Sequence, residues 1–253
     1  MLNEILPASL FAVALVFVRI GAALMLLPAY SEPYVTPRLR LLLALMIALI
    51  VAPVVSPKLP AMPASAIQLG VLILGEILIG VFFGTIGRLF LSALATAGMM
   101  VAYMSSMANA LTNDPSAAQQ GSIAGSFLTL MALLMIFTLN LHHLMLAAVV
   151  DSYQLFVPGQ VPPVGDLSDM VTHLVSRTFL LSFQIAAPFI AVAMIFYLGL
   201  GLLARLMPQM QVFFVAMPVQ ITIGMLVLMA TLPTIVRWFT DALEQAFVPF
   251  AVL

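Results

Sequence analysis

Apolar residues fill six long runs of the chain, and short polar or proline-containing stretches separate them. A transmembrane helix needs about 20 predominantly apolar residues, so runs of this length predict membrane-embedded helices. The pattern therefore predicts an all-α membrane protein of about six apolar segments. These runs are Ala8 to Tyr30, Leu39 to Val55, Ile67 to Met104, Ile123 to Val150, Thr178 to Leu206 and Val212 to Val236.

The third run is longer than one span requires, so it either bends into two segments or forms one steep helix that extends beyond the bilayer. Three stretches lie outside the apolar runs: a polar interruption at residues 105–122, an expected loop at 152–176 and a short amphipathic tail at 237–253. None of them is long enough for a separate soluble domain. We therefore expect residues 1–253 to form a single membrane domain.

Composition supports a membrane environment and excludes several other classes. Of the 253 residues, 64% are hydrophobic and 7% are charged, whereas soluble domains carry about 25% charged residues. The net charge of −1 provides no basic surface for nucleic acid. The chain has no cysteine, which excludes disulfides and thiolate metal sites.

Arg19, Glu76, Arg88 and Arg205 lie inside or at the rim of apolar runs. Such groups usually face a bundle interior or water, because lipid cannot solvate a charge. On a straight helix Glu76 and Arg88 would be about 18 Å apart, too far to pair directly. Glu76 is expected to pair with Arg19 or Arg205 instead. A proton or ion relay normally needs more than one acid. These buried charges therefore favour an ion pair that serves assembly, or a contact with a partner subunit.

Small residues recur every four positions in the third run, at Gly80 and Gly84, followed at the same spacing by Arg88 and Ser92. Gly121 and Gly125 repeat the spacing at the start of the fourth run. Such stripes let helix backbones approach closely. They predict packing faces and do not identify what packs there.

The sequence lacks the common catalytic motifs. It contains no Gly-rich phosphate loop, no G-x-S-x-G nucleophile elbow and no HExxH zinc motif. We therefore expect no catalytic residue, no metal site and no cofactor, and a function other than catalysis.

The polar interruption begins with a short apolar stripe. Met104, Met107 and Leu111 are spaced by three and four residues, and Asn113 precedes an Asp114-Pro115 pair that favours a turn. One interpretation is a solvent-exposed connector between helices. The other is a mobile plug, in which the apolar side chains fill a lumen and the polar turn allows withdrawal. These six residues are the candidates for a pore plug.

The stretch RLMPQMQVFFVAMPVQ, Arg205 to Gln220, interrupts an otherwise apolar region of about fifty residues. It carries an arginine, three glutamines, and prolines at Pro208 and Pro218, each of which frees a backbone carbonyl from the helix ladder. Lipid cannot satisfy these groups. The stretch is therefore expected to pack against protein or to line a wet cavity.

This stretch closely resembles the hallmark of the FliR family of flagellar export proteins, which includes the equivalent component of injectisome type III secretion. The matching residues are Arg205, Pro208, Gln209, Gln211 and Pro218. Further matches along the chain are Arg19-Ile20-Gly21 followed by Pro28, Pro37 with Arg38 and Arg40, Gly75-Glu76 with Gly80, and Asp114-Pro115. Two positions depart from the family pattern, with Ala216 in place of a common glycine and Gln220 in place of a frequent lysine.

The resemblance implies a subunit of the flagellar type III export gate in the bacterial inner membrane, within the flagellar basal body. Family members form helical hairpins in a superhelical cone with FliP-like and FliQ-like subunits, and an FlhB-like protein wraps its entrance. Unfolded flagellar proteins pass through the pore, and the loop matching Met104 to Ser122 acts as a plug. The motif residues would then make assembly contacts.

Two alternatives remain open at this stage. The injectisome homologue would be the same machine with a different cargo. A small-solute secondary transporter would also contain broken helices and charges near the membrane centre. The chain, however, shows no matched pair of broken segments in two halves.

Overall fold

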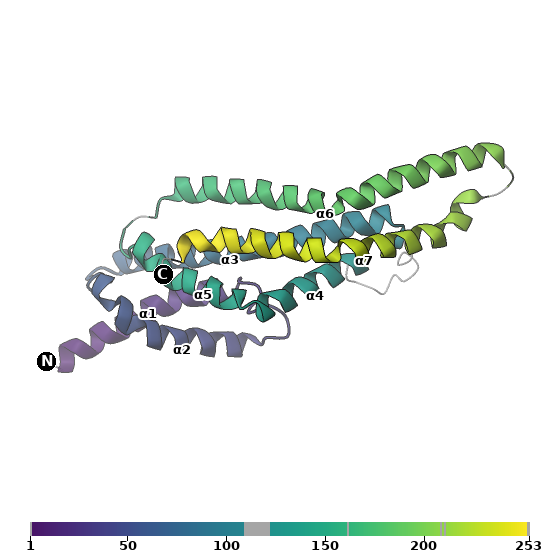
Figure 1. The fold of residues 1–253 in the computed structure, drawn as a ribbon. Coiled ribbons are helices and arrows are strands. Elements are labelled where there is room, and N and C mark those ends of the chain that lie inside the picture. Colours follow the sequence, from purple (N-terminus) through teal and green to yellow (C-terminus); the bar gives the residue numbers. More distant parts are fainter. Residues whose placement is uncertain (1, 109–121, 161, 208, 210, 252–253) are drawn as a thin grey trace. The chain divides into compact units, whose positions relative to one another are not determined.

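The computed structural model describes residues 2–108, 122–160, 162–207, 209 and 211–251, and the side chains of these residues except 2–8 and 213. Regular structure in the described chain is helical throughout (Figure 1), which confirms the predicted all-α class. The helices are α1 (Leu2–Leu24), α2 (Pro37–Val55), η1 (Ser56–Lys58), α3 (Ala66–Met104), α4 (Ile123–Thr138), α5 (Leu141–Leu155), α6 (Val164–Leu206), α7 (Val212–Phe247) and η3 (Val248–Phe250).

Four helices of the described chain are long and apolar enough to cross a membrane, and a fifth span arises if α4 and α5 count as one. The apolar part of α1, Ser9–Leu24, is shorter than these. The six predicted runs therefore correspond to α1, α2, α3, the α4–α5 pair, α6 and α7. The long third run is one continuous helix of 39 residues rather than two segments.

The expected loop at residues 152–176 is wrong in part, and the amphipathic tail is largely helical. Residues 164–176 belong to α6, because Leu167, Val171 and Leu174 recur at helical spacing and turn inward. The expected tail after Val236 continues α7 as far as Phe247, which is fully buried. In both places polar residues on the outer face interrupt the apolar run, although the helix continues through them.

The fourth apolar run contains a break that its hydrophobicity does not indicate. Helices α4 and α5 meet at an angle of 71°. Asn140, between them, has a positive φ of 57°, a left-handed conformation that asparagine tolerates better than most residues. One polar residue thus turns the chain inside an apolar stretch.

The chain divides into two compact units. The first comprises Met1–Leu89, Ile136–Leu174 and Ala242–Leu253, and the second comprises Phe90–Met135 and Val175–Asp241. Each is described by itself below.

In the first unit, α1 packs against α2 and against a glycine face of α3. A Cβ added at Gly80, Gly84 or Gly87 would overlap atoms of α1 or of the segment that follows it. The predicted stripe is correct for Gly80 and Gly84 and wrong for Arg88, which is exposed rather than buried. On an α-helix a step of four residues rotates the side-chain direction about 40° past a full turn, and a step of three residues falls about 60° short of one. After the four-residue step from Gly80 to Gly84, a three-residue step brings the packing face back at Gly87 rather than at Arg88.

In the second unit, α3 and α4 touch through glycine. A Cβ on Gly98 would overlap the backbone of Gly125, as the small-residue pattern predicts for Gly125, whereas Gly121 lies outside the described residues. Beside this contact Val101, Ala102, Ala124 and Phe189 form a buried hydrophobic cluster. Within the same unit, Figure 1 shows α6 and α7 joined as a hairpin, with a bend partway along α6, the helix that contains Pro188.

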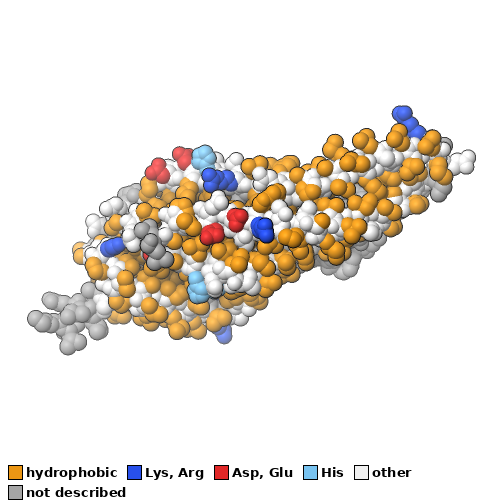
Figure 2. Space-filling model, in the orientation of Figure 1, with side chains coloured by type: hydrophobic (Ala, Val, Ile, Leu, Met, Phe, Trp, Pro, Cys, Tyr) orange, Lys and Arg blue, Asp and Glu red, His pale blue; other side chains and the backbone are white. Residues whose placement is uncertain are grey.

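Much of the molecular surface is apolar. Figure 2 shows hydrophobic side chains over most of the visible face, with few charged groups among them. Leu198, Leu202 and Leu206 on α6 and Met229 on α7 are each about two-thirds exposed or more. A surface of this kind requires lipid or protein partners to cover it.

Replacing Gly98 with alanine should destabilise the protein by about 1–3 kcal/mol, because the added methyl group overpacks the contact between α3 and α4. The measurement is thermal or chemical unfolding of the purified protein in detergent. Gly70→Ala is the matched control, since a Cβ there meets nothing within 4 Å. Equal stability of the two variants would contradict the close contact.

Candidate functional site

A buried ion pair connects three helices of the first unit. Arg19 of α1 is 0% exposed and Glu76 of α3 is 2% exposed. The guanidinium donates from Nε to Glu76 Oε2 at 2.6 Å and from Nη2 to Oε1 at 3.0 Å. It also donates to Ser152 Oγ at 3.0 Å and to the Phe156 carbonyl at 2.9 Å. The Tyr153 ring lies 3.7 Å from the guanidinium carbon.

This geometry decides between the two partners that the sequence offered for Glu76. The partner is Arg19, and the bidentate arrangement is the strongest form of such a pair, whereas Arg205 is exposed. Both Glu76 oxygens accept hydrogen bonds from the same guanidinium. The pair therefore holds α1 against α3, and Ser152 and Phe156 extend the hold to α5.

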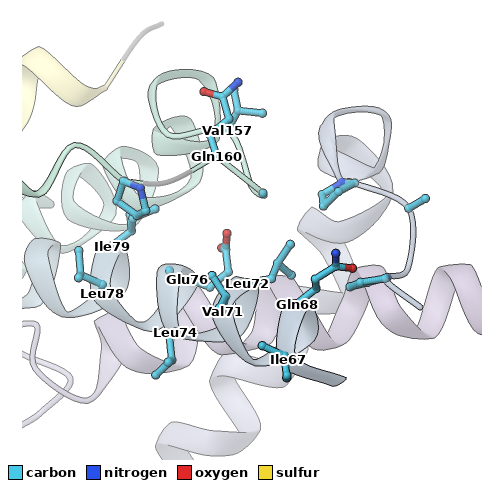
Figure 3. Close-up of a pocket in the computed structure, with 16 residues that line it drawn as sticks. Ile67, Gln68, Val71, Leu72, Leu74, Glu76, Leu78, Ile79, Val157 and Gln160 are labelled. Carbon is cyan, nitrogen blue, oxygen red and sulfur yellow. The ribbon is translucent and has the colours of Figure 1, made fainter. Parts of the chain in front are cut away.

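A cleft of about 530 Å³ lies beside Glu76 in the same unit. Figure 3 shows Glu76 rising from α3 toward the segment that carries Val157 and Gln160. Most of the lining is hydrophobic, and Gln68 and Gln160 contribute amide groups. The cleft thus has one carboxylate in its wall, and that carboxylate is already neutralised by Arg19.

The second polar site is centred on Gln220 of α7, which is 4% exposed. Its Nε2 donates to the Met104 carbonyl at 2.8 Å and to Tyr197 Oη at 3.1 Å. Its Oε1 accepts from Ser106 Oγ at 2.8 Å. We call Gln220, Met104, Ser106 and Tyr197 the Gln220 cluster. It joins α7 and α6 to the end of α3.

The local sequence explains why α3 ends at this cluster. Ser105 donates from Oγ back to the Val101 carbonyl at 2.7 Å, and Ser106 takes a positive φ of 56°. A Cβ on Gly224 would overlap the Ser105 side chain, so the absence of a side chain there lets α7 approach. The end of α3 is thus held against α7 by the hydrogen bonds of Gln220 and by the close contact between Ser105 and Gly224.

The plug candidates fall into two groups. Met104 and Met107 are half-buried and pack against the cluster of Val101, Ala102, Ala124 and Phe189. Leu111, Asn113, Asp114 and Pro115 lie outside the described residues. The two described methionines therefore sit on the core of the second unit, directly before the polar interruption.

The motif residues lie on the surface of the isolated chain. Arg205, Gln209, Gln211 and Pro218 are exposed, and Pro208 lies outside the described residues. The expectation of protein packing is therefore not met by this chain's own helices at these positions. An open hollow of about 520 Å³, bordered by Gln211, lies between the end of α6 and the start of α7.

Gln220 is the site residue that sequence reasoning missed. The sequence marked it only as a departure from a family pattern, although it is the third glutamine of the motif stretch and, once buried, needs a hydrogen-bond partner. Its partner Ser106 lies more than a hundred residues away along the chain, and its partner Tyr197 lies about twenty residues away. Sequence spacing therefore did not indicate them. Within the described residues, no group of three or more acidic or histidine side chains is placed to hold a metal ion.

Comparison with known proteins identifies similar chains over nearly the whole length. The model for bacterial export proteins, family 1, matches residues 10–246. Flagellar biosynthetic protein FliR of Caulobacter vibrioides is 35% identical over 93% of this chain and 94% of its own. FliR of Bacillus subtilis is 28% identical over 92% and 88% of the two chains. Yop proteins translocation protein T of Yersinia pestis is 26% identical over 90% and 88%.

Glu76→Gln should destabilise the protein by about 3–5 kcal/mol, because it leaves the Arg19 charge buried without its counter-charge. Unfolding in detergent measures the change. Arg88→Gln is the control and should change stability by less than about 0.5 kcal/mol, since Arg88 is exposed.

Replacing both partners, as in Arg19→Met with Glu76→Met, should recover part of the loss because no unpaired charge remains. If Glu76→Gln were as stable as Arg88→Gln, the ion pair would not hold the three helices together.

Proposed function

The chain belongs to family 1 of the bacterial export proteins, and on that premise we propose that it is a subunit of the flagellar type III export gate. The family match over residues 10–246 carries this proposal, together with the FliR relative that aligns over nearly the full length of both chains. The chain is a multi-pass helical membrane protein of this export machinery. Its role is structural, as a conduit for protein rather than as an enzyme.

The gate assembles from this chain with FliP-like and FliQ-like subunits, and an FlhB-like protein joins them at the inner membrane. Two features support this assembly. The surface of the isolated chain is largely apolar. The motif residues Arg205, Gln209 and Gln211 are exposed at the α6–α7 hairpin, where Gln211 borders a hollow. An exposed arginine in such a setting needs a partner, because lipid offers it none. Residues 1–253 act as one domain, since α3, α4, α6 and α7 each run through both compact units.

The chain also helps to seal the pore. Met104 and Met107, which we call the seal methionines, stand at the start of the polar interruption and pack, half-buried, on a small apolar cluster. Methionine is flexible and fills irregular gaps, so it suits a seal that must close again after a polypeptide has passed. Residues 109–121 would complete the plug.

The cargo is unfolded flagellar protein rather than injectisome effectors. Identity is higher to the FliR of Caulobacter vibrioides, at 35%, than to the injectisome relative, at 26%. A flagellated strain lacking this gene should regain motility when the gene is restored.

Arg205→Ala should reduce assembly with the FliP-like and FliQ-like subunits, because it removes an exposed charge that the partners would satisfy. Co-purification followed by mass analysis of the complex measures the loss. Arg237→Ala, outside the motif, is the control and should assemble normally. Normal assembly of Arg205→Ala with failed export would assign Arg205 a role in transport instead.

Replacing both seal methionines with serine should raise the ion conductance of the assembled gate severalfold, because a shorter polar side chain leaves a wet gap. Deletion of residues 108–119 should have the same effect. Planar-bilayer recording of purified gates measures the conductance. Met229→Ser, on the exposed face of α7, is the control. An unchanged conductance in both seal variants would rule out the sealing role.

A further inference from the structure

The turn that ends α3 is held by a single side chain from another helix. The Met104 carbonyl belongs to the last turn of α3, where carbonyls have no partner within the helix. Gln220 Nε2 supplies that partner at 2.8 Å. Two residues later the buried Ser106 hydroxyl donates to the same amide at 2.8 Å. One amide thus satisfies two polar groups of the same turn.

The orientation of the amide follows from the chemistry of its partners. A backbone carbonyl can only accept a hydrogen bond, so the group that faces Met104 must be the amide nitrogen. The oxygen then faces Ser106, whose hydroxyl can donate. The second amide hydrogen reaches Tyr197 Oη at 3.1 Å, which anchors the amide to α6.

Little space exists for water to replace this amide. The cavity beside it, bordered by Met104, Ser105, Gln220 and Gly224, has a volume of about 10 Å³. One water molecule needs at least about 10–15 Å³. If the amide were lost, the Met104 carbonyl and the Ser106 hydroxyl would have to find other partners by moving. The turn cannot move toward α7, because Ser105 already lies so close to Gly224 that a Cβ there would overlap it.

The backbone at Ser106 favours such a movement. Its φ of 56° is uncommon for a residue with a side chain and costs free energy that the surroundings must offset. The hydrogen bond to Gln220 is the contact that spans from this residue to α7. Release of that bond would relax the turn, which contains Met104 and leads directly to Met107.

We propose that Gln220 acts as a latch that holds the turn at Met104–Ser106 against α6 and α7 and thereby keeps the seal methionines closed. This inference rests on the sealing role proposed above and adds the residue that positions the seal. The latch is a set of neutral hydrogen bonds. It can therefore open during passage of a polypeptide without leaving a buried charge unpaired.

The test is the resting ion conductance of each assembled gate, measured in planar bilayers and normalised to the amount of intact complex. Ser106→Ala is the smallest change, since it removes only the hydroxyl that binds the latch. We expect it and Gln220→Leu to shift the ratio of open to closed gates by roughly tenfold toward open, equivalent to about 1.4 kcal/mol. Thr231→Val is the matched control, because it removes a hydrogen bond within α7 that does not reach the latch.

The double variant Ser106→Ala with Gln220→Leu distinguishes a latch from two independent effects on the leak. If Ser106 acts through Gln220, Ser106→Ala should add little to the leak of Gln220→Leu, whereas independent effects would add. A purely structural role would lower the yield of intact complex and leave the conductance of each gate unchanged. That result, in Ser106→Ala, would overturn the latch.

The serine variant of the seal methionines separates the two proposals. If it leaks while Ser106→Ala and Gln220→Leu stay closed, the latch is wrong and the seal stands. If neither the seal variant nor the latch variants leak, the sealing role itself fails. Should Gln220→Leu not assemble, Ser106→Ala and Tyr197→Phe still decide the question, because each removes one latch contact and keeps the amide.

Discussion

The guanidinium of Arg19 has to be satisfied inside an apolar bundle, and the first unit is arranged around that requirement. A buried charge without partners costs several kcal/mol, so Glu76, Ser152 and the Phe156 carbonyl converge on it from α3 and from α5 with its C-terminal end. Such close convergence needs backbones that nearly touch, and Gly80 supplies the space where α3 crosses α1 directly at Arg19. The charge and the glycine face are thus two parts of one constraint.

The second unit joins its helices with neutral hydrogen bonds instead. Gln220 connects α7 and α6 to the end of α3 through an amide, a hydroxyl, a phenol and a carbonyl. Breaking neutral bonds costs less than separating buried charges. A charge pair suits a part of the molecule that stays assembled, and an amide suits a part that opens and closes. This difference fits the proposal that the second unit carries the seal.

The largely apolar surface relates the fold to assembly. Hydrophobic side chains remain exposed along α6 and α7, and Arg205, Gln209 and Gln211 stand exposed among them at the hairpin. Sequence reasoning predicted that lipid cannot satisfy this stretch. It expected the stretch to pack against protein or to line a wet cavity. The chain's own helices leave these residues exposed, and Gln211 borders the hollow at the hairpin. This exposure supports the proposal that other subunits of an export gate cover the stretch.

The sequence by itself determined the class, the apolar segments, the absence of common catalytic motifs and the likeness to export proteins, because hydrophobic runs and short motifs are local properties. It narrowed the partner of Glu76 to two arginines. Only the tertiary structure identified Arg19 as that partner, placed Arg88 on the surface and brought Gln220 to the end of α3. The turn at Asn140 also became visible only there. The physical reason is the same in each case: pairing and burial depend on which helix faces meet, and residues far apart in the chain decide that together.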